Sequence, residues 1–259
     1  MNTRKIISVA VGVLVPIALL AWWYLASAGS LNPFFPPLRD IVVRFKELWL
    51  FDHFATDVLP SLGNLFVGFA IAVILGVALG FAMATVPVLN AMLSPVVQFL
   101  RGIPPVALIP ILITLVGFGN EMRVASIVIA AMFPTMLSTI DGIRSVEPGL
   151  KDVGAVYRFS RGDRLLRVYL PSSLPQIVSG MQVSLQVAFI VMIASEMLGS
   201  SQGIGAMTLL AQQSFMSADM WAGILLLGLI GFLTNILFDL VKNRVLSWYV
   251  SSKRLERAA

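Results

Sequence analysis

The chain has 259 residues, of which 58% are hydrophobic and only 12% are charged, and its mean hydropathy is +0.91. This composition excludes a soluble globular domain and indicates a polytopic membrane protein. The absence of cysteine excludes disulfides and thiolate chemistry, and the single histidine, His53, leaves little for a metal site or a proton relay. The formal net charge is +5, but the basic residues lie in short loops beside apolar runs, so nucleic-acid binding is not expected.

The first apolar run predicts a membrane span. Residues 6–28 carry no charge and contain Trp22, Trp23 and Tyr24, which suit a membrane interface. Residues 26–28 (Ala-Ser-Ala) have the form of a signal-peptidase site, but the apolar run before them is longer than the roughly 7 to 15 residues of a signal peptide. We therefore expect an uncleaved span, with cleavage as the alternative.

Residues 38–51 follow a proline-rich lead and predict an amphipathic helix. Its apolar stripe consists of Leu38, Ile41, Val42, Phe45, Leu48 and Trp49. Most of the other positions are charged, which is typical of a helix that lies along a membrane surface. Packing of the stripe against the rest of the protein is an equally good interpretation at this point.

Residues 58–100 carry no charge, which is too long for one span and predicts a hairpin that breaks at residues 85–90. Its first arm contains Gly76 and Gly80, four residues apart, which indicates a face for close helix packing.

The second arm of the hairpin predicts a broken span over residues 92–117. Pro104, Pro105 and Pro110 interrupt the apolar run, and a uniform helix cannot satisfy the freed backbone groups unless protein or water covers them. Arg101 precedes the prolines. It could contact an anionic substrate, or it could lie near the cytoplasmic end and pair with an acidic loop residue.

Three further spans complete a set of six, at residues 124–143, 174–198 and 220–241. Of the 18 lysines and arginines, 13 lie in the two termini and the basic loop, which we define as residues 144–173. The positive-inside bias therefore predicts that both termini and the basic loop are cytoplasmic. The expected division is a first span at 1–28, an extracytoplasmic segment at 29–57, a core of five spans at 58–241 and a basic tail at 242–259.

The basic loop predicts two short helices. Pro148 suits the first position of one helix, with apolar residues at helical spacing after it and a small patch at Gly154 and Ala155. Ser160 and Asp163 have the spacing of a capping box, so a second helix is expected to run to a stop at residues 170–171 (Leu-Pro). An ordinary positive-inside loop is the alternative.

Enzymatic activity is not expected. The sequence has no G-x-x-x-x-G-K-[ST] or H-E-x-x-H motif, no cysteine and no serine–histidine pair on adjacent spans, so no catalytic residues are predicted. Movement of a solute is the expected function. The rival is a carrier or channel driven by an ion gradient, but Asp141, Glu196 and Asp239 lie near span ends rather than mid-span.

Four stretches carry a family resemblance: residues 100–107 (LRGIPPVA), 117–119 (GFG), 170–175 (LPSSLP) and 196–205 (EMLGSSQGIG). With them, the chain resembles the permease subunits of bacterial ATP-binding-cassette (ABC) importers of the nitrate/sulfonate/taurine type. The resemblance implies an all-α membrane protein with the type I (MetI-like) fold, in the inner membrane. It also implies a homodimer, two cytoplasmic ATPase subunits and an extracytoplasmic solute-binding protein. ATP would be used by the ATPase, and this chain would bind no cofactor or metal.

The resemblance further implies site residues. When the family's cytoplasmic hallmark is registered on Leu170 and Pro171, its Glu-Ala-Ala falls on Asp-Val-Gly and its glycine falls on Arg158, which departs from the pattern. The implied ATPase-coupling residues are Asp152, Val153, Gly154, Ala155, Arg158, Ser160, Arg161, Leu170 and Pro171. The candidate translocation residues are Arg101, Pro104, Pro105, Glu196 and Gly199. The expected solute is a small anion such as a sulfonate, taurine or nitrate, with a neutral heterocycle as the alternative.

Overall fold

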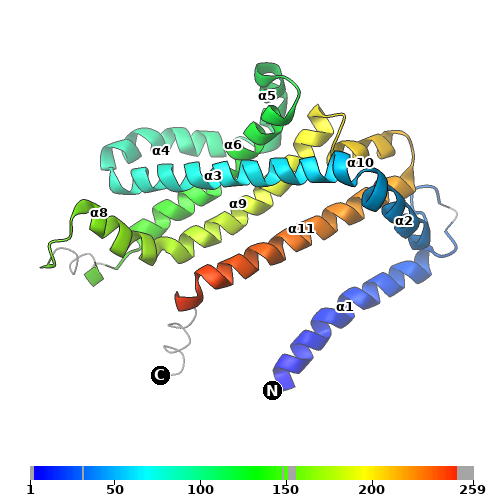
Figure 1. Ribbon diagram of the computed structural model, residues 1–259, viewed down its shortest axis with the longest axis horizontal. Coiled ribbons are helices and arrows are strands. Elements are labelled where there is room, and N and C mark those ends of the chain that lie inside the picture. The colour runs from blue at the N-terminus through cyan, green and yellow to red at the C-terminus, as the bar shows by residue number, and fades with distance from the viewer. Residues whose placement is uncertain (1–2, 31, 148, 151–155, 250–259) are drawn as a thin grey trace.

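The computed structural model describes residues 3–30, 32–147, 149–150 and 156–249, and all regular structure within them is helical (Figure 1). The long helices are α1 (Thr3–Ser27), α3 (Leu59–Thr85), α6 (Asn120–Arg144), α9 (Leu170–Gly199) and α11 (Ser217–Val245). The shorter ones are α2 (Leu38–Phe45), η1 (Lys46–Asp52), η2 (Phe54–Val58), α4 (Pro87–Arg101), η3 (Pro105–Leu108), α5 (Ile109–Val116), α8 (Arg161–Arg164), η4 (Leu165–Tyr169) and α10 (Ile204–Gln213).

Four or five of these units can cross a membrane. Residues 54–85, 120–144, 162–199 and 217–245 are helices of sufficient length and hydropathy, and α4 with η3 and α5 forms a fifth, bent unit. The apolar part of α1 within the described residues, Leu14–Ser27, is shorter than a full span. The all-helical membrane class is therefore confirmed, while the sixth span stays a prediction.

Helices α3, α6 and α9 form the centre of the molecule and lie side by side in Figure 1. An added Cβ at Gly76 would lie 2.7 Å from the carbonyl oxygen of Met132, and one at Gly80 would lie 2.5 Å from that of Met136. The two glycines thus allow the backbones of α3 and α6 to touch, which confirms the predicted packing face. The buried residues of this centre include Leu65, Ala72, Ile127, Ala131, Ala188 and Met192.

The amphipathic helix packs against the rest of the protein. It comprises α2 and the π-helical η1, and its residues Ile41 and Trp49 are buried together with Ile204 of α10 and Leu226 of α11. On its polar side, Arg44 binds Asp219 at the start of α11 with contacts of 2.5 and 2.9 Å. The hydrogen bonds to Asp219 raise the pKa of Arg44 above its usual value. The structure therefore agrees with the interpretation in which the apolar stripe packs against the rest of the protein.

Helix α1 contacts the remainder through aromatic rings at its C-terminal end. The ring centroid of Trp23 lies 5.6 Å from that of Trp221 in α11 and 6.4 Å from that of Phe35. Ser27, inside the Ala-Ser-Ala tripeptide, is buried and accepts a hydrogen bond of 3.1 Å from the Leu38 N–H. The central serine of the tripeptide is therefore packed into the fold, while Ala26 and Ala28 are exposed.

One boundary prediction was wrong. The helix that starts at Arg161 does not stop at Leu170 and Pro171 but continues through η4 into α9 as one helix over residues 162–199. Pro171 directly follows the π-helical segment η4, where the Leu170 N–H bonds to the Leu165 carbonyl five residues back, so the α-helical hydrogen-bond pattern already changes at the point where the proline lies. The chain therefore passes from the basic loop into the membrane without a break.

Candidate translocation site and coupling region

The broken span bends at the predicted prolines. Helix α4 ends at Arg101, η3 starts at Pro105, and the helices on either side of the break meet at 91°. Pro104 is extended, with a ψ of 124°, because a residue before a proline is driven out of the helical region. Arg101, Pro104 and Pro105 therefore lie together at the break, and all three are exposed.

Arg101 borders two cavities. One, of about 310 Å³, is mainly apolar and is also lined by Leu108, Phe133 and Val187. The other, of about 360 Å³, is also lined by polar residues that include Asn90, Ser94, Gln98 and Asp141. Within the part of the chain that the structure describes, Arg101 has no hydrogen bond or ion pair, even though Asp141 lines the same cavity. An unpaired guanidinium between a polar and an apolar cavity can attract a small anion.

A buried polar network lies at the end of the bundle where α2 and α10 are found, at the right of Figure 1. Glu196 of α9 is fully buried and accepts hydrogen bonds from the Ser61 hydroxyl of α3, at 2.5 Å, and from the Gly205 N–H, at 2.9 Å. Asp57 accepts the Gly203 N–H at 2.6 Å. These contacts tie the start of α3 to the loop between α9 and α10, residues 200–203.

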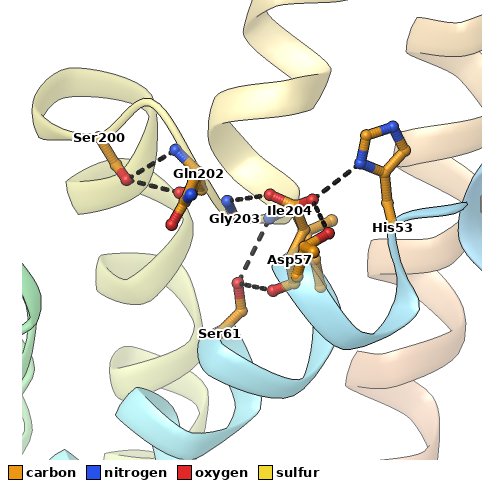
Figure 2. A network of polar contacts seen from close by, with 8 residues as sticks. His53, Asp57, Ser61, Ser200, Gln202, Gly203 and Ile204 are labelled. Carbon is orange, nitrogen blue, oxygen red and sulfur yellow. Dashed lines mark hydrogen bonds and ion pairs between the residues drawn. The ribbon is translucent and has the colours of Figure 1, made fainter.

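Figure 2 shows how the network extends to His53 and to the loop. The Nδ1 atom of His53 lies 2.8 Å from Asp57, and the Ile204 N–H donates to the Ser61 hydroxyl at 3.3 Å. The Ser200 hydroxyl accepts the Gln202 N–H at 3.0 Å, which closes the tight turn of the loop. The carboxylates of Asp57 and Glu196 thus accept hydrogen bonds from the Gly203 and Gly205 N–H groups, which have no helical partner.

Gly203 in the loop and Gly205 in the first turn of α10 pack closely against Glu196. Gly203 has a φ of +111°, and a Cβ there would lie 2.5 Å from the Glu196 carboxyl carbon. A Cβ at Gly205 would lie 2.7 Å from the carbonyl oxygen of Ile193. The Gly-Ile-Gly pattern therefore serves close packing on a buried carboxylate.

The structure separates the five candidate translocation residues into two groups. Arg101, Pro104 and Pro105 lie at the exposed break, whereas Glu196 and Gly199 are buried at the C-terminal end of α9. A Cβ at Gly199 would lie 2.5 Å from the terminal methyl of Met122. In this conformation neither Glu196 nor Gly199 faces an open path.

The sequence analysis did not identify Asp57, Ser61 and Arg123 as part of the polar cluster around Glu196. Arg123 of α6 is only 7% exposed, donates from Nε to the Gly119 carbonyl at 3.4 Å, and attracts Glu196 electrostatically. Among the described residues its Nη1 atom has no hydrogen-bond partner. For Asp57 and Arg123 the sequence did carry a signal, because an acid or an arginine at the edge of an apolar run requires a partner when it is buried.

The capping box of the basic loop is present. The Ser160 hydroxyl accepts the Asp163 N–H at 3.1 Å and donates to the Asp163 carboxylate at 2.6 Å. Arg158, where the family pattern has glycine, has a φ of +52°. This left-handed conformation suits glycine and costs other residues energy. The other implied hallmark positions, 152–155, lie outside the described residues.

Together, an all-helical apolar bundle, a bent span and an unpaired arginine between cavities define a membrane transport protein. The chain belongs to the family described as "binding-protein-dependent transport system inner membrane component", whose profile matches residues 72–247. It is the permease subunit of an ABC importer, a class of protein that works with an ATPase and a solute-binding protein.

Several permease proteins are similar to this chain over most of their length. The putative aliphatic sulfonates transport permease protein SsuC of Bacillus subtilis (strain 168) is 30% identical over 243 residues, which cover 92% of this chain and 87% of the relative. The taurine transport system permease protein TauC of Escherichia coli (strain K12) is 26% identical, with coverage of 94% and 90%. The nitrate import permease protein NrtB of Leptolyngbya laminosa is 29% identical, with coverage of 88% and 84%.

Solved structures show the same fold. A structure titled as an inward-facing conformation of the MetNI methionine ABC transporter aligns with a TM-score of 0.59 at 18% identity, over 74% of this chain and 93% of that one. A structure titled as an amino acid ABC transporter with histidines aligns with a TM-score of 0.55 at 16% identity, over 80% and 95%. The MetI-like permease fold predicted from the resemblance is thus confirmed at the level of the helical core.

Proposed function

We propose that this permease forms the translocation pathway for a small organic or inorganic anion. The relatives are named for sulfonate, taurine, nitrate and bicarbonate transport, and all of these solutes carry an anionic group. The observation that carries the proposal is the position of Arg101, which is unpaired among the described residues and borders both cavities at the bend. Pro104 and Pro105 keep the span open at this point, so that the guanidinium is accessible.

In the same proposal, Glu196 and Gly199 do not line the pathway but hold together the helices beside it. Glu196 holds the start of α10 against α3, and Gly199 lets α9 approach α6. These contacts hold together the extracytoplasmic ends of three helices. They would have to move as a unit when the pathway opens to the binding protein.

The driving force comes from a partner subunit. Two copies of the permease, each in the inner membrane with cytoplasmic termini, would dock on two ATPase subunits through the basic loop, while a binding protein delivers the solute from outside. ATP is bound and hydrolysed by the ATPase, and this chain binds no cofactor. The continuous helix from residue 162 to residue 199 supports this assignment, because movement of the basic loop is transmitted directly into a spanning helix.

The coupling part of the proposal is tested by co-purification. Gly154→Trp is expected to abolish ATPase association without unfolding the spans, because the small patch of the basic loop would be filled. Arg39→Gln, in α2 and outside the basic loop, is the control and should co-purify normally. Undiminished ATPase recovery with Gly154→Trp would contradict the coupling role.

The transport part is tested in proteoliposomes that contain the permease, its ATPase and its binding protein. Uptake of radiolabelled taurine, an alkanesulfonate and nitrate is measured with ATP or a non-hydrolysable analogue inside. The proposal expects uptake of an anion that requires ATP hydrolysis. Rapid uptake by the permease alone under an ion gradient would instead identify a secondary carrier.

A further inference from the structure

A third cavity, of about 720 Å³, lies at the end of the molecule where the basic loop enters the bundle. It is bounded by the last turn of α3, the last turn of α6 and the segment formed by α8 and η4, at the left of Figure 1. By the charge bias of the sequence, this is the cytoplasmic end of the spans. The transport function described above does not use this cavity.

The charged part of the cavity lining is entirely basic. Arg144 and Arg164 line the cavity, and no acidic residue does. Both side chains are exposed, and neither has a hydrogen bond or ion pair with another described residue. The nearby acid Asp163 is already engaged, because it binds Ser160 at 2.6 Å and Arg167 at 3.2 Å. Asp141, one turn before Arg144 in α6, lines the neighbouring polar cavity but forms no ion pair with Arg144. The cavity therefore presents two guanidinium groups that no described acid pairs with directly.

The remainder of the lining is mostly apolar and continues onto the outer surface of a spanning helix. Phe81, Val86 and Leu165 form much of this part. Phe81 shares one face of α3 with Ile74, which is two turns away and 66% exposed. An apolar stripe of α3 therefore leads along the membrane to a doubly basic cavity at its cytoplasmic edge.

We infer that this cavity binds the headgroup of an anionic phospholipid, with one acyl chain lying along the α3 stripe. Basic pockets between spanning helices on the cytoplasmic side suit such headgroups, because the guanidinium groups pair with phosphate while the walls accept the first acyl carbons. A soluble phosphate would use only the basic half of the cavity. The bound lipid would join the end of α3 to Leu165 and Tyr169, at the base of the basic loop.

The direct test is lipid retention by the purified full-length permease. The protein is incubated with an equimolar mixture of phosphatidylglycerol and phosphatidylcholine of identical chains, and bound lipid is counted by native mass spectrometry. We expect the wild type to prefer phosphatidylglycerol by about tenfold, from two basic contacts at the membrane surface. The double variant Arg144→Gln/Arg164→Gln should lose this preference, and the Arg144→Lys/Arg164→Lys variant should keep most of it.

Arg244→Gln is the matched control, because Arg244 is an exposed arginine in the last turn of α11 that does not line the cavity. It should leave the preference unchanged. Arg144 also borders the polar cavity beside Arg101, so the double variant is scored by lipid retention and not by transport. Equal retention by the wild type and the glutamine double variant, or no preference in the wild type, would overturn the inference.

Two further measurements separate the occupants. Millimolar inorganic phosphate should not displace the lipid, whereas complete displacement would identify a soluble phosphate site. Phosphatidylglycerol with a photoreactive group near the headgroup end of its acyl chain should label the peptide that contains Phe81 and Val86. If assembly with the ATPase empties the site and prevents this labelling, the cavity belongs to the protein partner and the lipid assignment is wrong.

Discussion

Ser61 of α3 and Glu196 of α9 are 135 positions apart in the chain, yet both are fully buried and are joined by a hydrogen bond of 2.5 Å. The same carboxylate accepts the Gly205 N–H in the first turn of α10, so one side chain connects three helices. A buried carboxylate is costly unless its surroundings supply donors, and here they come from the elements that it connects. The contact explains why the start of α3, the end of α9 and the start of α10 close around a single acid.

Replacement of Glu196 by alanine should destabilise the permease by about 3 kcal/mol, because the buried Gly205 N–H loses its acceptor, the Ser61 hydroxyl keeps only the Asp57 carbonyl, and Arg123 loses its nearby opposite charge. The measurement is thermal unfolding in detergent, followed by tryptophan fluorescence. Ser200→Ala removes only an exposed loop contact and should cost less than about 0.5 kcal/mol. Equal melting temperatures for the wild type and the Glu196 variant would contradict the network.

Gly203→Ala should also be destabilising, by about 2 kcal/mol, because its Cβ would overlap the Glu196 carboxyl group and its φ of +111° is strained for alanine. Gly228→Ala is the control, since Gly228 lies inside α11 and its Cβ would meet no atom within 4 Å. That change should be neutral or slightly stabilising. The same unfolding assay applies, and a stable Gly203 variant would show that the loop packs differently.

The packing of α3 on α6 predicts opposite effects for two glycines of one helix. Gly80→Ala should cost about 2 kcal/mol, because the added methyl would lie 2.5 Å from a backbone carbonyl oxygen of α6 that cannot move independently. Gly63→Ala, in the same helix but with open space around it, should gain about 0.5 kcal/mol. Comparison of their melting temperatures tests the interface, and equal values would contradict it.

Local patterns in the sequence predicted the parts of this fold that depend on near neighbours. The two prolines at residues 104–105 predicted the break, and the four-residue spacing of Gly76 and Gly80 predicted a close helix contact. The capping box at Ser160 depends on only four residues and was also correct. In each case the physical cause lies within about one helical turn.

Long-range pairings could not be predicted in the same way. Asp57 accepts the N–H of Gly203, which is 146 positions away, and the local sequence around either residue does not indicate the other as its partner. The stripe of the amphipathic helix likewise predicted a buried face but not its partners on α10 and α11. The stop expected at Pro171 was wrong because the continuous helix accommodates the proline at the junction of the π-helical η4 with α9, a change of hydrogen-bond pattern that the local sequence did not indicate.

Arg158 offers a prediction of increased stability. Because its φ of +52° suits glycine, Arg158→Gly should stabilise the basic loop by about 0.5 kcal/mol after the greater chain entropy of glycine is allowed for. Amide hydrogen exchange in the peptide around Asp163 should slow accordingly. Arg158→Lys keeps the strain and should exchange as the wild type does, and faster exchange in the glycine variant would contradict the interpretation.

The most direct test of the central claim is ATP-dependent anion uptake by the assembled importer when Arg101 is replaced by glutamine or lysine. If the solute passes the unpaired guanidinium at the bend, Arg101→Gln should lower uptake about tenfold or more at a substrate concentration below saturation, and Arg101→Lys should keep most of it. Binding of the solute to the separate binding protein should be unchanged in both. Wild-type uptake by the Arg101→Gln importer would contradict the account.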